Sequence, residues 1–215
     1  RASVYIGRQY YFDEITKHLS DTNCKPFGTF SSPAPPLLSY ILLCCVVIVG
    51  DSGSGKSALT CNWTLQYKNA QQHKLVVAHY IGCTSASTDL SNLLRRYLQQ
   101  LSQDYHFSNN VIFRVIGEIK ERFSLDKDIP RDLPGMIEAF PDWLSEAGQR
   151  GGMVLVLDAL NQLEDRGQGD AHDLQWLPRE FPNGVQLIVS TLPGRCLNAL
   201  NARRWPQLRV EPLSP

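Results

Sequence analysis

The sequence predicts an α/β fold in which a mainly parallel, five-stranded sheet is flanked by helices. Three observations support this fold class. Short apolar runs alternate with segments whose apolar residues recur at helical spacing, which is typical of parallel strands joined by helical crossovers. The first run, 45–49, leads directly into a glycine-rich turn and a helical segment. The 215-residue chain is also 43% hydrophobic, enough for a single domain with a substantial core.

Each of the five expected strands is a short, mainly apolar run. Strands inside a parallel sheet are covered on both faces, so they lack the apolar–polar alternation of half-exposed strands. The expected strands are 45–49, 75–81, 153–157, 185–189 and 208–210. Because ligands of such sheets bind at the carboxyl ends of the strands, polar residues that follow these runs are the first candidates for a functional site.

Helices are expected between the strands, at 57–67, 90–101, 111–123 and 134–144. The first follows the glycine-rich turn, and in the other three apolar residues recur at helical spacing. Near the start of the chain, the same spacing predicts the core side of another helix. Its apolar residues are Tyr11, Phe12, Ile15 and Leu19.

The chain reads as one domain over 1–215, with an entry segment at 1–21, an irregular loop or insertion at 22–45 and the core of the fold at 46–215. The apolar stretch 37–49 is far shorter than the roughly 20 residues that cross a bilayer. The first residue is arginine rather than methionine, so we expect a segment of a larger, multidomain protein.

The charge balance argues against nucleic acid and membrane partners. The chain carries 21 basic and 21 acidic residues and has a pI near 7.1, so no net field draws it to nucleic acid or to an anionic membrane. Its six cysteines show no metal-ligand spacing. We therefore expect reduced thiols, no disulfides and a cytoplasmic location.

The glycine-rich turn 50–57, GDSGSGKS, has the pattern of a phosphate-binding P-loop, or Walker A motif. Glycines let successive backbone N–H groups point at phosphate oxygens, and the following helix adds its positive end. Lys56 can reach the β and γ phosphates, and the Ser57 hydroxyl can ligate Mg²⁺. The alternative is a surface turn rich in serine and glycine. The candidate nucleotide-binding residues here are Gly50, Asp51, Ser52, Gly53, Ser54, Gly55, Lys56, Ser57 and Ala58.

A second motif, MVLVLD at 153–158, is an apolar strand that ends in a carboxylate, the form of a Walker B element. Asp158 would lie at the carboxyl end of that strand, where it can hold Mg²⁺ together with Ser57. The alternative is a turn-forming or helix-capping aspartate. No NKxD base-reading motif and no LSGGQ signature occur in the chain, which argues against a GTPase and a transporter ATPase.

Together these residues resemble the NACHT domains of the signal-transduction (STAND) ATPases, in particular the nephrocystin-3-like and telomerase-protein-component-like members. The resemblance rests on the P-loop and four further segments. These are VYIGR at 4–8, HYIGCTS at 79–85, VLVLDALNQL at 154–163 and VQLIVSTLPG at 185–194. It implies an ATP- or ADP-dependent, Mg²⁺-binding switch that can homo-oligomerise within a signalling scaffold, joined to helical repeats and other protein partners.

The resemblance also assigns residues outside the two motifs. The entry motif of the family lies beside the adenine, so Ile6, Gly7 and Arg8 become candidate base and ribose contacts; an ordinary turn is the alternative. Ser190 and Thr191 are interpreted as polar groups at a strand end near the phosphates, and Thr191 is counted among the nucleotide-binding residues.

Two departures from the family pattern bear on hydrolysis. Typical members have two acids where this chain has Asn161 and Gln162. These amides can hydrogen-bond a water but lack the basicity of a general base. The candidate catalytic residues are therefore reduced to Asp158, as the Mg²⁺ ligand, and Gln162, as a residue that holds a water. The family arginine after the strand at 185–189 is replaced by Leu192, and Arg195 is better interpreted as a solvated residue.

We therefore expect a nucleotide switch that hydrolyses ATP slowly or not at all. One alternative is an active ATPase whose base comes from Glu164, Asp165 or a neighbouring subunit. The other is an interaction scaffold that binds no nucleotide. His79, within an apolar strand, is expected to be a packed histidine rather than an acid or base.

Overall fold

The computed structural model describes residues 8–20, 45–82, 107–163 and 171–212. In these residues five strands form one sheet in the order β2-β3-β4-β1-β5, and every pairing is parallel. The strands are β1 (Cys45–Val49), β2 (Leu75–Tyr80), β3 (Met153–Asp158), β4 (Val185–Thr191) and β5 (Gln207–Arg209). The predicted fold class and all five expected strands are confirmed.

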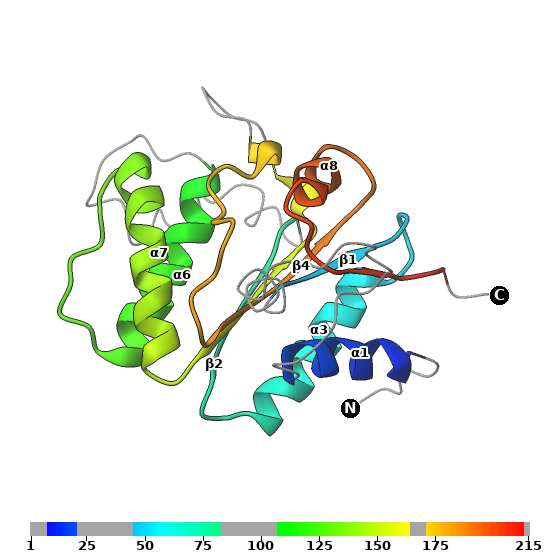
Figure 1. The fold of residues 1–215 in the computed structure, drawn as a ribbon, viewed down its shortest axis with the longest axis horizontal. Helices are drawn as coiled ribbons and strands as arrows, with labels where there is room; N and C mark the ends of the chain where they lie inside the picture. The colour runs from blue at the N-terminus through cyan, green and yellow to red at the C-terminus, as the bar shows by residue number, and fades with distance from the viewer. Residues whose placement is uncertain (1–7, 21–44, 83–106, 164–170, 213–215) are drawn as a thin grey trace, which may run out of the picture.

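Helices precede the first strand and occupy the connections between the strands (Figure 1). They are α1 (Gln9–Ser20), α3 (Lys56–Ala70), α6 (Phe107–Phe123), α7 (Leu133–Gln149) and α8 (Arg195–Asn201), with short 3₁₀ turns η2 (Leu160–Gln162) and η3 (Ala171–Asp173). Three of the predicted helices are confirmed with longer bounds, and the expected helix at 90–101 lies outside the described residues. The sequence did not predict α8, which is too short to show a helical period.

The sheet is covered on both faces, as Figure 1 shows: α6 and α7 lie on one side, and α1 and α3 on the other. Alternate residues of each strand point to opposite faces. In β1, Val47 and Val49 belong to the cluster with α6, α7 and α8, whereas Val46 and Ile48 pack with α1 and α3. This double coverage explains why β1 and β3 are almost entirely apolar, whereas the edge strand β5 carries exposed Gln207 and Arg209.

The helix predicted near the start of the chain is α1. Its residues Phe12, Ile15 and Leu19 are buried against α3 and the sheet, as the spacing predicted. Trp63 Nε1 donates to Thr16 Oγ1 at 3.0 Å and links α1 to α3. The helix α1 is therefore part of the same core as the P-loop strand.

The register brings the carboxyl ends of three strands together. Val49 of β1 pairs with Thr191 of β4, and Leu157 of β3 pairs with Val189 of β4. The P-loop and Asp158, which follow or end these strands, therefore share one edge of the sheet. None of the helices in the described ranges is long and apolar enough to cross a membrane.

Candidate functional site

The turn after β1 has a backbone conformation that requires glycine at two positions. Gly53 and Gly55 have φ values of 77° and 83°, which other residues rarely adopt. Ser54 N donates to the carbonyl of Asp51 at 3.2 Å and closes the turn. Gly50 is needed for close packing, because a Cβ there would lie 2.4 Å from the carbonyl oxygen of Val210. The segment after β5 therefore packs directly against the start of the loop.

Lys56 is the first residue of α3, and its side chain folds back over the loop. Nζ donates to the carbonyls of Gly50 and Asp51, each at 2.8 Å, and to Ser54 Oγ at 3.3 Å. Burial lowers the pKa of Lys56 below its usual 10.5, and the nearby carboxylates of Asp158 and Asp51 oppose part of that effect. The loop thus holds a lysine ammonium group at the candidate phosphate site.

The first turn of α3 presents backbone donors to the same place. The first helical hydrogen bond runs from Leu59 N to the carbonyl of Gly55 at 2.9 Å. The N–H groups of Lys56, Ser57 and Ala58 precede this bond, so no carbonyl of the helix accepts from them. N–H groups at a helix N-terminus attract anions. The exposed residues of this stretch are Asp51, Ser52, Gly53, Ser57 and Ala58.

Asp158 ends β3 and is fully buried. Its Oδ1 accepts from Ser190 Oγ at 2.6 Å and lies 3.0 Å from Thr60 Oγ1. Its Oδ2 is buried and has no hydrogen-bond partner among the described residues. Burying a carboxylate oxygen without a partner is unfavourable. Because carboxylate oxygens are preferred ligands of Mg²⁺, Oδ2 fits the predicted role of Asp158 as a metal ligand.

Sequence reasoning missed the role of Thr60. Its hydroxyl lies 3.0 Å from Asp158 Oδ1 and 3.0 Å from the carbonyl oxygen of Ser57. A hydroxyl has one proton, so Thr60 shares it between the two candidate metal-binding residues. Thr60 follows Lys56 by four residues, which places both on one face of α3. The sequence feature that could have indicated this role is the polar side chain of Thr60 four residues after Lys56.

Two neighbouring hydroxyls of β4 have different partners. Ser190 Oγ donates to Asp158 and accepts from Ala159 N at 2.8 Å, so it orients the carboxylate. Thr191 is buried beside the last residue of β1, and its Oγ1 donates to the carbonyl of Leu192 at 3.1 Å. Thr191 therefore borders the start of the P-loop, as predicted for a strand-end group.

Asn161 and Gln162, in η2, have separate surroundings. Asn161 Oδ1 accepts from Leu192 N at 3.1 Å and ties the segment after β3 to the end of β4. Gln162 is exposed, and its Cβ and Cγ lie 3.3 Å from the place that a Cβ on Gly82 would occupy. Gly82 follows β2, which lies on the opposite side of β3 from β4 and β1. The side chain of Gln162 is thus directed toward the β2 end of the sheet.

Arg8 lies at the start of α1 and is only 2% exposed. Its Nη2 donates to the carbonyl of Glu211 at 3.0 Å, and its guanidinium lies 5.6 Å from the centroid of the Tyr11 ring. Nε and Nη1 are buried without a hydrogen-bond partner in the described ranges. Glu211 follows Val210, which contacts Gly50, so the fold brings Arg8 close to the P-loop.

Four other residues named from the sequence lie outside the described residues. Two are candidate adenine contacts and two are candidate bases: Ile6, Gly7, Glu164 and Asp165. Arg195 is exposed on α8, where its Nη2 lies 3.9 Å from Asp173 Oδ1.

Known proteins resemble this chain along most of its length. A family model described as nephrocystin 3, N-terminal, matches residues 43–190. A TPR repeat-containing protein of Dictyostelium discoideum is 28% identical over 220 residues, which cover 89% of this chain and 13% of that protein. Nephrocystin-3 of Homo sapiens is 28% identical over 207 residues, which cover 95% of this chain and 13% of that protein.

A third relative is NACHT and WD repeat domain-containing protein 2 of Homo sapiens. It is 26% identical over 201 residues, which cover 86% of this chain and 10% of that protein. The chain thus spans only a small part of the length of these relatives. The predicted resemblance to nephrocystin-3-like NACHT domains is confirmed. Because the family model matches well over half of its residues, the chain belongs to the nephrocystin 3 N-terminal family.

Proposed function

We propose that this chain is an ATP- or ADP-binding switch module of a multidomain signalling or scaffold protein, with slow or absent hydrolysis. One observation carries the proposal: the ammonium of Lys56 is held over the loop near Asp158, and one buried oxygen of the Asp158 carboxylate has no hydrogen-bond partner among the described residues. Membership of the family supports a nucleotide-binding module that forms part of a larger protein.

In this proposal the P-loop backbone, the first turn of α3 and Lys56 bind the phosphates. Ser57 and Asp158 hold Mg²⁺, which neutralises phosphate charge when it is bound. Thr60 and Ser190 keep the Asp158 carboxylate in a fixed orientation. These two contacts support the proposed metal-binding role of Asp158, because they orient its carboxylate before a nucleotide binds.

Arg8 serves the adenine side of the site, together with Ile6 and Gly7. Its Nε and Nη1 are donors that lack a partner in the described residues, so they can hydrogen-bond to a base or ribose. Thr191 borders the P-loop at the end of β4. These residues complete the proposed contacts to the nucleotide.

Slow hydrolysis follows from the residues after Asp158. Asn161 and Gln162 are amides without useful basicity, and loss of a general base slows such a reaction by roughly 10²–10⁴-fold. Asn161 instead accepts from Leu192 N, and Gln162 packs beside Gly82. Both contacts favour structural roles. The nucleotide would then act by holding a conformation rather than by turnover.

Thermal unfolding with Mg²⁺ and ATP, ADP or GTP tests the proposal. We expect ATP or ADP, at a hundred times its dissociation constant, to stabilise the fold by about 2.7 kcal/mol. Lys56→Ala should lose this stabilisation, because the phosphates lose their cation. Lys68→Ala, an exposed position on the same helix, should keep it.

Other outcomes would contradict the proposal. Folded protein that shows no nucleotide-dependent shift would favour an interaction scaffold. A turnover of about 1 s⁻¹ or more would contradict slow hydrolysis and favour the active ATPase. A stabilisation of equal size with GTP would contradict the proposed selectivity for adenine nucleotides.

A further inference from the structure

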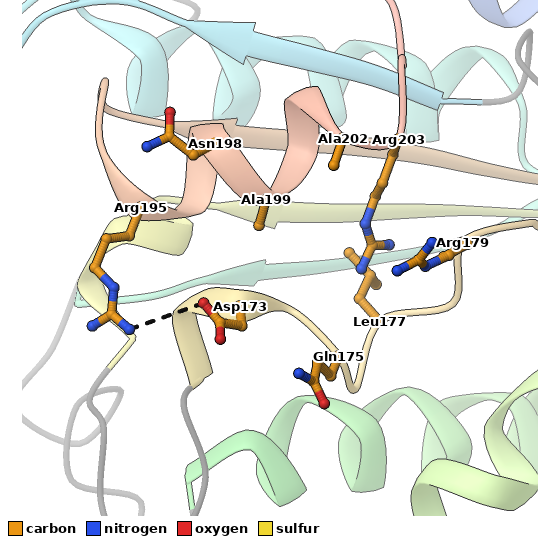
Figure 2. A pocket seen from close by; sticks show the side chains of 9 residues that line it. All are labelled: Asp173, Gln175, Leu177, Arg179, Arg195, Asn198, Ala199, Ala202 and Arg203. Atoms are coloured by element: carbon orange, nitrogen blue, oxygen red, sulfur yellow. Dashed lines mark ion pairs between the residues drawn. The ribbon is translucent and has the colours of Figure 1, made fainter.

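The segment 171–179, the helix α8 and the residues that follow it line an open cavity of about 650 Å³ that the proposed nucleotide site does not use. Figure 2 shows three arginines and one aspartate among its lining side chains: Arg179, Arg195, Arg203 and Asp173. The cavity therefore carries an excess of positive charge in a chain whose net charge is zero. Small and apolar side chains, such as Leu177 and Ala199, lie between the charged ones.

Arg203 is a fixed positive charge at one end of the cavity. Its Nη1 donates to the carbonyl of Pro178 at 2.7 Å, its Nη2 donates to that of Leu174 at 2.5 Å, and its guanidinium lies 4.9 Å from the Trp205 ring centroid. Burial, and then the charge of Arg179, lower the pKa of Arg203 to about 10. Two guanidinium groups thus repel each other here, and an anion bound between them would relieve that repulsion.

The third arginine lies at the other end. Arg195 begins α8, whereas Arg203 follows its last turn, and Figure 2 shows them at opposite ends of the cavity. At a rise of about 1.5 Å per residue, the helix separates these ends by roughly 10 Å. One phosphate ion is too small to contact both ends. An extended peptide, with about 3.3 Å per residue, covers that distance in about three residues.

We propose that this cavity binds an extended acidic segment of a partner protein. Its carboxylates contact Arg195 at one end and the Arg179–Arg203 pair at the other, and its backbone lies over Ala199 and Ala202. Arg195 Nη2 already lies 3.9 Å from Asp173 Oδ1, an ion pair between exposed side chains that an incoming carboxylate can replace or share. The proposal does not depend on nucleotide binding.

A fluorescein-labelled hexaglutamate peptide, titrated with the 215-residue chain and followed by fluorescence anisotropy, tests the proposal. The variant Arg179→Gln/Arg195→Gln removes charge from both ends and leaves the backbone contacts of Arg203 intact. We expect its dissociation constant to rise roughly tenfold, since each exposed charge contact contributes modestly. Arg131→Gln, an exposed arginine before α7, is the matched control and should bind like the parent.

Two results would overturn the proposal. One is hexaglutamate that fails to bind the parent chain or binds the double variant equally well. The other is inorganic phosphate that displaces the labelled peptide at the same concentration as unlabelled hexaglutamate, which would indicate an anion site instead. Thermal unfolding verifies that the variants fold. If the double variant does not, Arg179→Gln and Arg195→Gln give the same comparison separately, one end at a time.

Discussion

At the scale of single residues, Asp158 depends on hydroxyl groups from two other elements. Ser190 Oγ donates to Asp158 and accepts from the backbone of Ala159. Ser190→Ala would leave a buried carboxylate oxygen and a backbone N–H with fewer partners. We expect the free energy of unfolding to fall by about 1–3 kcal/mol in urea denaturation.

Ser52, an exposed serine of the P-loop, provides the control for this prediction. Ser52→Ala removes a hydroxyl at an exposed position and should change the free energy of unfolding by less than about 0.5 kcal/mol. If both variants lose the same small amount, the hydroxyl of Ser190 does not support the Asp158 carboxylate.

His79 is the packed histidine that the sequence predicted. It is 5% exposed, and its Nδ1 lies 3.4 Å from Arg114 Nη1. An arginine can only donate, so Nδ1 is the acceptor and the proton of the neutral ring is on Nε2. Nε2 is buried with no hydrogen-bond partner within the described part of the chain. Burial, and then the charge of Arg114, lower the pKa of His79 to about 4 from 6.5.

This shift predicts a pH-dependent stability. Between pH 6.5 and 4 the unfolded chain binds a proton at His79 that the folded chain does not, so stability falls as the pH falls. We expect His79→Gln to remove about 2 kcal/mol of the loss between pH 7 and pH 5, measured by urea denaturation. His73→Gln, at an exposed position, should leave the pH profile unchanged. Parallel profiles for parent and His79→Gln would contradict the prediction.

At the scale of elements, two glycines in neighbouring helices have opposite roles. A Cβ at Gly148 of α7 would lie 2.2 Å from the carbonyl oxygen of Asn183, in the segment before β4. Gly148→Ala must therefore displace backbone, and we expect a loss of about 1–3 kcal/mol in the free energy of unfolding. Thermal or urea denaturation measures it.

Gly117 of α6 is the matched control. No heavy atom lies within 4 Å of a Cβ placed there, so Gly117→Ala should stabilise the helix by about 0.5–1 kcal/mol. Equal effects at the two positions would show that the contact between α7 and the segment before β4 does not require glycine.

At the scale of the whole molecule, Arg8 connects the first described helix to the segment after the last strand. It is nearly fully buried, with two guanidinium nitrogens that lack partners among the described residues. Burying a charge whose donors lack partners is unfavourable, so removing it offsets the loss of its other contacts. Arg8→Met should therefore keep the nucleotide-free stability within about 1 kcal/mol of the parent.

The same variant should weaken nucleotide binding, because Arg8 is proposed to contact the base or ribose. We expect the dissociation constant for ATP to rise about tenfold, the effect of losing roughly 1.4 kcal/mol of binding free energy. Tyr11→Phe is the control, since it removes only the hydroxyl that accepts from Glu211 N at 3.2 Å. Unchanged ATP affinity in Arg8→Met would restrict Arg8 to a structural role.

Much of the fold follows from local rules in the sequence. Short apolar runs predicted all five strands, and those inside the sheet are apolar because both of their faces are covered. Helical spacing predicted α1, α6 and α7, whereas α3 was predicted from its position after the P-loop. The helix α8 was missed because seven residues span too few turns to show a period. The P-loop was predicted because its glycines and lysine are consecutive in the chain.

The sequence by itself determined the fold class, the strands and the P-loop, since each depends on residues close together along the chain. Tertiary structure alone decided how Asp158 is held and where Arg8 lies. Thr60 and Ser190 are 98 and 32 residues from Asp158, and Arg8 is 203 residues from Glu211. Such contacts depend on strand order and register, which bring distant segments to one edge of the sheet and which no local pattern encodes.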